Sequence, residues 1–244
     1  MISTAVILFG AAVAAFAQTV AGFGFALVAV PIFVLVLTVP EAVGTAAFLS
    51  FVNALAVASQ ARRDVAWPLV KRLFLGSLLG MPFGLAVLLG SSGDLLRVGV
   101  GVVSILMAAA IVASVPFRTP GRVGTIGVGV ASGFLTTSIA INGPPVVLFL
   151  QALGVPQGVF RATSSAFFVV NGVVSLSVFA LSGVIGAETM LRILWALPAL
   201  LAGNLLGHLL LPRVGPPAFR RLVLGLLIVS ASLSLFEGLQ GLWD

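Results

Sequence analysis

Two short stretches of this sequence combine polar side chains with residues that interrupt helices. Residues 18–25 read QTVAGFGF, and residues 137–147 read TSIAINGPPVV. Glycine adopts conformations that other residues avoid, and proline has no backbone N–H, so a regular helix loses hydrogen bonds at both places. Because strongly apolar sequence flanks both stretches, each is expected to begin a short helix within apolar surroundings.

The chemistry that suits these two breaks is the binding of an anion. The start of a helix presents unpaired N–H groups and about half a positive charge. Two such starts that converge would bind an anion with few cationic side chains. The candidate residues of the breaks are Gln18, Thr19, Gly22, Gly24, Thr137, Ser138, Asn142 and Gly143.

Further polar side chains follow each break at a matching interval. Thr45 precedes Asn53 by eight residues, and Thr163 precedes Asn171 by eight residues. This interval is about two helical turns, so each pair shares one helix face. We expect Thr45, Asn53, Thr163, Ser164 and Asn171 to complete the pocket. The alternative is structural, because Ser and Thr often bond to their own helix and Asn can join helices.

Charged candidates are few. Arg161 lies just before Thr163, where it either attracts an entering anion or anchors its helix at the membrane interface. The acidic residues all lie near segment ends, and the chain has no cysteine and one histidine, His208. We therefore expect no catalytic residue, no metal site and no cofactor, and an intramembrane enzyme is disfavoured.

The composition is that of a polytopic membrane protein. Of the 244 residues, 60% are hydrophobic and 7% are charged, whereas a soluble domain has about 25% charged residues. The formal charge is +6, and the basic residues lie mainly at segment ends. There they indicate membrane topology, so we do not expect a nucleic acid partner.

Ten hydrophobic segments follow one another along the chain. They lie near 2–18, 24–38, 42–60, 67–89, 96–115, 122–138, 143–153, 159–182, 189–211 and 217–236. A membrane span needs about 20 residues, so segments 24–38 and 143–153 are too short to cross unaided. The fold class expected is all-α. Ala15-Phe16-Ala17 resembles a signal-peptide cleavage site, but no basic residue precedes it, so we expect the first segment to be retained.

Basic residues give the expected orientation. If the ten segments alternate in direction, one side receives Arg62, Arg63, Lys71, Arg72, Arg118, Arg122, Arg161, Arg213, Arg220 and Arg221. The other side receives only Arg97 and Arg192. The positive-inside rule makes the first side cytoplasmic, and both termini are then expected outside. Two segments that enter and return would give the same alternation.

The two halves of the chain match weakly but in order. Besides the Thr–Asn pairs, Gly80 and Gly84 match Gly203 and Gly207 at a spacing of four residues. We expect two membrane repeats, 1–115 and 116–244, with five segments each. An odd number of segments inverts the second repeat, and paired short segments with Gly and Pro are typical of secondary transporters. The alternative is that apolar sequences align easily.

Residues 18–33 (QTVAGFGFALVAVPIF) and 133–172, which include INGPP and RATSS, resemble the sulfite exporter TauE/SafE family. The resemblance covers essentially the whole chain. It implies transport of sulfite, sulfoacetate or another organosulfonate, usually outward across a bacterial inner membrane. The family often has a run of glycines where this chain has Gly22-Phe23-Gly24-Phe25 and Asn142-Gly143-Pro144-Pro145.

The expected function is secondary transport of a small sulfur-containing anion by alternating access. A passive anion channel, a transporter of a different small organic anion and a scaffold subunit remain as alternatives. The expected partners are the anionic substrate and the lipid bilayer, and assembly as a homodimer is left open.

Overall fold

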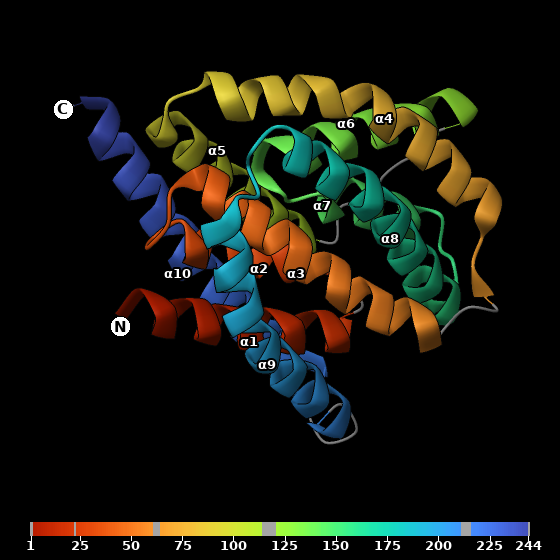
Figure 1. Ribbon diagram of the computed structural model, residues 1–244. Helices are drawn as coiled ribbons and strands as arrows, with labels where there is room; N and C mark the ends of the chain where they lie inside the picture. The colour runs from red at the N-terminus through yellow and green to blue at the C-terminus, as the bar shows by residue number, and fades with distance from the viewer. Residues whose placement is uncertain (1, 22, 61–63, 114–120, 211–215, 244) are drawn as a thin grey trace.

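The computed structural model describes residues 2–21, 23–60, 64–113, 121–210 and 216–243. Gly22, Arg62, Arg63, Arg118, Arg213 and the expected boundary between the repeats lie outside these ranges. Within them the chain forms ten helices and no strand (Figure 1). The helices are α1 (Ile2–Ala21), α2 (Phe25–Phe33), α3 (Val39–Gln60), α4 (Trp67–Gly90), α5 (Gly93–Ala113), α6 (Arg122–Ile139), α7 (Gly143–Ala152), α8 (Gln157–Leu181), α9 (Ala187–Leu210) and α10 (Pro216–Trp243).

Six helices in the described ranges are long and apolar enough to cross a membrane. They are α1, α3, α4, α5, α8 and α9. Large apolar side chains on their outer faces are exposed, as Phe83 on α4 is to 69%. Such surfaces suit lipid rather than water. The chain is thus a multi-pass helical membrane protein, as its composition predicts.

The two short helices begin where the sequence predicts breaks. Gly24, with a φ angle of 98°, precedes α2. Ala140 ends α6 with a φ angle of 57°, which is unusual for a residue that carries a Cβ. Pro144 stands in the first turn of α7, where a helix does not need its N–H. At about 1.5 Å per residue, α2 and α7 each reach roughly half of a bilayer core.

Helices from the two halves of the chain pack in pairs. α1 lies along α9, α4 along α6, α3 along α8, and α5 along α10. Figure 1 shows the α4–α6 pair on one side of the molecule and the α1–α9 pair on the other, with α2, α3, α7 and α8 between them. The core therefore lies between two outer pairs.

Glycines set the distance between the two helices of each outer pair. A Cβ atom on Gly80 of α4 would overlap the carbonyl oxygen of Val130 on α6. A Cβ atom on Gly203 of α9 would overlap the carbonyl oxygen of Ala12 on α1. Small residues allow this close approach of helix backbones, which is a common source of association in membranes.

The short helix α2 is entirely enclosed. Each of its residues from Phe25 to Phe33 is buried. It packs against α1, α3 and α10, while α7 packs against α6 and α8. The fold therefore holds the starts of both short helices inside the protein, where the free backbone groups are shielded from lipid.

Candidate functional site

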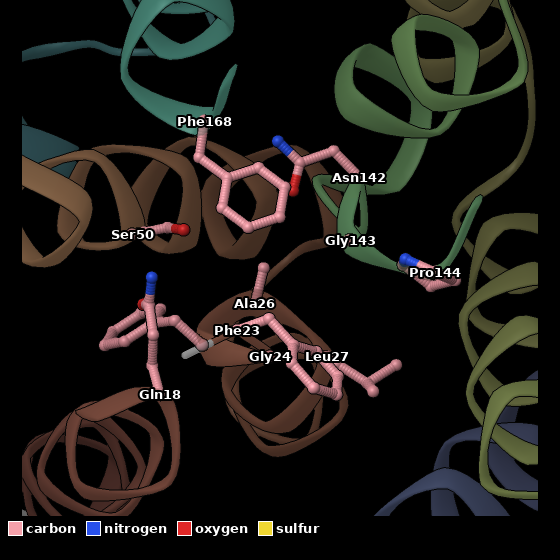
Figure 2. Close-up of a pocket in the computed structure, with 11 residues that line it drawn as sticks. Gln18, Phe23, Gly24, Ala26, Leu27, Ser50, Asn142, Gly143, Pro144 and Phe168 are labelled. Carbon is pink, nitrogen blue, oxygen red and sulfur yellow. The ribbon is translucent and has the colours of Figure 1, made fainter. Parts of the chain in front are cut away.

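A small buried cavity lies where the two helix breaks meet (Figure 2). The residues that line it are Gln18, Phe23, Gly24, Phe25, Ala26, Leu27, Ser50, Asn142, Gly143, Pro144 and Phe168. Its empty volume is about 290 Å³, of which the centre of a water molecule can reach only about 10 Å³. That is room for about one water molecule in this conformation.

The starts of α2 and α7 both contribute to this cavity. The first turn of α2 supplies Phe25 and Ala26, after the break at Gly24. In α7, Gly143 carries an N–H group but the two residues that follow it are prolines and carry none. The side-chain amide of Asn142 adds hydrogen-bonding capacity at the start with fewer backbone donors. Figure 2 shows this amide beside the Phe168 ring.

Gln18 reaches the cavity from the last turn of α1. Its Oε1 atom accepts a hydrogen bond from Asn53 Nδ2 at 2.9 Å. Asn53 Oδ1 in turn accepts one from Asn204 Nδ2 at 2.6 Å. The three side chains come from α1, α3 and α9 and form a continuous chain of amides. Asn53 lies behind Gln18 and does not itself line the cavity.

A second set of hydrogen bonds fixes the break before α7. Asn171 Nδ2 donates to Thr136 Oγ1 at 2.8 Å. Ser132 Oγ donates to the backbone carbonyl oxygen of Asn142 at 2.8 Å, and Thr136 Oγ1 donates to the Ser132 carbonyl oxygen at 2.7 Å. The position of Asn142 thus depends on α6, which is linked in turn to α8.

Comparison with known proteins identifies the family. A family model described as sulfite exporter TauE/SafE matches residues 6–233. The chain belongs to the sulfite exporter TauE/SafE family. No curated protein and no solved structure matched the chain in the corresponding searches. As a TauE/SafE member the chain is a membrane transporter, and both helix breaks lie within the matched range.

Several hydroxyl groups predicted for the TauE/SafE site bond to helix backbone instead. Thr19 Oγ1 donates to the Ala15 carbonyl at 2.8 Å. Ser138 Oγ and Ser164 Oγ likewise each donate to a carbonyl four residues earlier, and Thr137 Oγ1 donates to the carbonyls of Gly133 and Met81. None of these four residues lines the cavity in this conformation. Their contact with an anion stays a prediction.

Arg161 and Thr163 stabilise the ends of neighbouring helices. Arg161 Nη2 donates to the carbonyl oxygen of Thr19 at 3.0 Å, in the last turn of α1, where carbonyl groups lack helical partners. Thr163 Oγ1 accepts a hydrogen bond from the N–H of Ala66 at 3.0 Å, directly before α4. Thr45 is buried, and its hydroxyl has no partner among the described residues. All three residues lie off the cavity.

Four residues that line or support this cavity were not predicted from the sequence. Ser50 and Phe168 line the cavity and also a neighbouring one that includes Thr136 and Ser175. Asn204 and Thr136 hold residues that shape it. The interval of 118 residues between Thr45 and Thr163 offers a signal, since the same interval pairs Ser50 with Phe168. In the described residues no group of three His, Cys, Asp or Glu side chains could hold a metal ion.

Proposed function

We propose that this TauE/SafE member is a secondary transporter that exports a small sulfur-containing anion, such as sulfite, sulfoacetate or another organosulfonate, by alternating access. The observation that carries the proposal is the meeting of two helix starts in one buried cavity. Both starts favour negative charge, and no acidic side chain lines the cavity. Gln18, Asn142 and the backbone N–H groups of Phe25 and Gly143 would hold the oxygen atoms of the anion.

Many secondary transporters consist of two inverted halves, and matching hydrogen bonds support the proposed relation between 1–115 and 116–244. Asn53 donates to Gln18 across 35 residues of sequence, and Asn171 donates to Thr136 across the same 35 residues. The two pairs are related by the interval of 118 residues that relates Thr45 to Thr163. By this register Gly24 in the first break corresponds to Asn142 in the second.

Helix packing supports the same relation. Gly80 approaches Val130, and Gly203 approaches Ala12. Val130 lies 118 residues after Ala12, so these two residues correspond in the repeats. Gly203 corresponds to Gly80 by the matching spacing of the glycines. Each half therefore contributes one helix to each outer pair. Movement of the two outer pairs in opposite senses would open the cavity first to one side and then to the other.

The small size of the cavity favours a transporter over a passive channel. With room for about one water molecule, the cavity is too small for a sulfur oxyanion in this conformation, so we expect helices to move before an anion binds. With the basic loops in the cytoplasm of a bacterial cell, the potential across the inner membrane drives an anion outward. This potential supplies about 2.3 kcal/mol per charge for each 100 mV.

Asn142→Asp tests the site. The change preserves the size of the side chain but replaces a donating amide with a carboxylate, which repels an anion. We expect uptake of radiolabelled sulfite or sulfoacetate into proteoliposomes to fall at least tenfold, which corresponds to about 1.4 kcal/mol. The matched control is Gln151→Glu, which places a new carboxylate at the exposed end of the same helix, α7, and should leave uptake within twofold.

Three outcomes would count against the proposal. Equal uptake by Asn142→Asp and wild type would refute the site. Flux of another organic anion with none of sulfite or any organosulfonate would refute the substrate class. Flux that neither saturates nor shows countertransport would favour the passive channel.

A further inference from the structure

The amide chain behind Gln18 has a direction. A side-chain amide donates through nitrogen and accepts through oxygen, so each hydrogen bond fixes which end faces the next group. Asn204 donates to Asn53, and Asn53 therefore turns its nitrogen toward Gln18. Gln18 uses its oxygen in this bond, and its NH₂ group remains for the cavity. Gln18 and Asn53 are exposed to only 1% and 0%, so water offers them little alternative.

The picture of the cavity agrees with this direction. Figure 2 shows the Gln18 nitrogen turned toward the side on which Ser50 lies. If the three amide groups were reversed, Gln18 would turn its oxygen toward the cavity, and that oxygen would repel an anion. The orientation of a residue outside the cavity thus decides whether the cavity wall attracts or repels negative charge.

The other half of the protein lacks the group that sets this direction. Gly80 corresponds to Gly203 in the two halves, so the residues that follow them, Met81 and Asn204, also correspond. The side chain of methionine has no N–H to donate. In agreement, Asn171, the counterpart of Asn53, is buried with its Oδ1 atom unpartnered among the described residues. An Asn at this helix position is therefore not a general requirement for packing the repeat.

We propose that Asn204 is a positioning residue for anion selectivity. Through Asn53 it holds the Gln18 side chain with its NH₂ group, not its oxygen, toward the cavity. This inference rests on the proposed anion transport and assigns part of its selectivity to α9, a helix that does not line the cavity.

A double-mutant cycle tests the proposal in proteoliposomes. Asn204→Leu removes the donor at similar size, and we expect the KM for sulfite to rise about tenfold, the effect of one hydrogen bond to a charged group, with kcat within twofold. If Asn204 acts through Gln18, adding Asn204→Leu to Gln18→Leu should raise KM no further. Asn204→Asp, whose carboxylate can only accept, forces the reversed chain and should raise KM at least as much.

The matched control is Met81→Leu at the equivalent place on α4. It should leave KM within twofold, because Met81 accepts the hydrogen bond from Thr137 Oγ1 through its backbone carbonyl oxygen and not through its side chain. Effects of Asn204→Leu and Gln18→Leu that multiply independently would overturn the proposal.

A second measurement needs no substrate. The chain has five glutamines, so ¹⁵N-glutamine labelling gives a small set of side-chain NH₂ signals in NMR spectra. The signal lost in Gln18→Leu is that of Gln18, and we expect it to shift in Asn204→Leu without any anion present. An unchanged signal would refute the positioning role. A shifted signal in a protein that transports no sulfur-containing anion would refute the proposed function. It would still support the hydrogen bonds that link Asn204, Asn53 and Gln18.

Discussion

Thr45 and Thr163 occupy corresponding places on α3 and α8, yet only one of them has a hydrogen-bond partner among the described residues. Thr163 accepts a bond from the N–H of Ala66, at the start of α4. Thr45 is equally buried but unpartnered. The sequence pattern does not distinguish the two residues. In this conformation Thr163 stabilises a helix start and Thr45 does not.

A pair of matched substitutions should reveal this difference. Thr163→Val removes the acceptor at constant size and leaves the Ala66 N–H without a partner, so we expect a loss of about 1–3 kcal/mol in stability. Thr45→Val removes a hydroxyl that has no partner and should be neutral or stabilising. Thermal unfolding of the purified protein in detergent measures both. Equal losses for the two variants would contradict the assignment.

The sequence allowed part of the cavity to be predicted at this scale. Gln18, Gly24, Asn142 and Gly143 stood out because polar or helix-breaking residues are rare in apolar segments, and all four line the cavity. Thr19, Thr137, Ser138 and Ser164 stood out for the same reason but bond to backbone. A hydroxyl group in a helix can either contact a ligand or bond to the backbone, and only the direction of its side chain distinguishes the two roles.

At the scale of elements, the contact between α4 and α6 depends on glycines, which carry no side chain. A Cβ atom on Gly129 of α6 would overlap the carbonyl oxygen of Leu73 on α4, and one on Gly133 would overlap that of Ser77. The same α6 helix carries Gly127, where a Cβ atom would meet nothing within 4 Å. One helix therefore offers both a test position and its control.

Gly129→Ala should separate α4 from α6, because a backbone carbonyl cannot move aside as a flexible side chain can. We expect a loss of at least 2 kcal/mol, comparable with overpacking of a well-packed core. Gly127→Ala should be neutral or stabilising by about 0.5–1 kcal/mol, the gain from replacing glycine within a helix. Melting temperatures in one detergent compare the two. Similar values for both variants would be inconsistent with a glycine-dependent contact.

The positions of the helices could be predicted from the sequence better than their partners. Glycine and proline mark the starts of α2 and α7, so these boundaries follow from local chemistry. The pairing of α1 with α9 and of α4 with α6 could not be read in the same way. In water an apolar stripe points to the core, but in lipid both faces of a helix are apolar, and the pattern no longer tells which face has a protein neighbour.

At the scale of the whole molecule, the distribution of basic residues predicts which ends of the helices face the cytoplasm. The connection before α5 belongs to the expected outer side, and the connection before α8 to the inner side. Exposed residues are available at both places, Ser92 in the first connection and Gln157 at the start of α8. The chain has no cysteine, so a single introduced thiol reports on its position without background.

Ser92→Cys should react with a membrane-impermeant maleimide added outside intact spheroplasts. Gln157→Cys should react only after the membrane is permeabilised, because it lies on the side that carries ten of the twelve Lys and Arg residues. Labelling in the opposite pattern would invert the expected orientation. Labelling of both residues from outside would show that the segments between them do not alternate as expected.

The tightness of the cavity between α2 and α7 has a consequence for the cell that contains this protein. A membrane stores energy only while small ions cannot leak through its proteins. A site with space for about one water molecule is too small to hold a sulfur oxyanion in this conformation. Under the proposed mechanism, each anion therefore waits for whole helices to rearrange, so transport would be slow and would open no path for other ions.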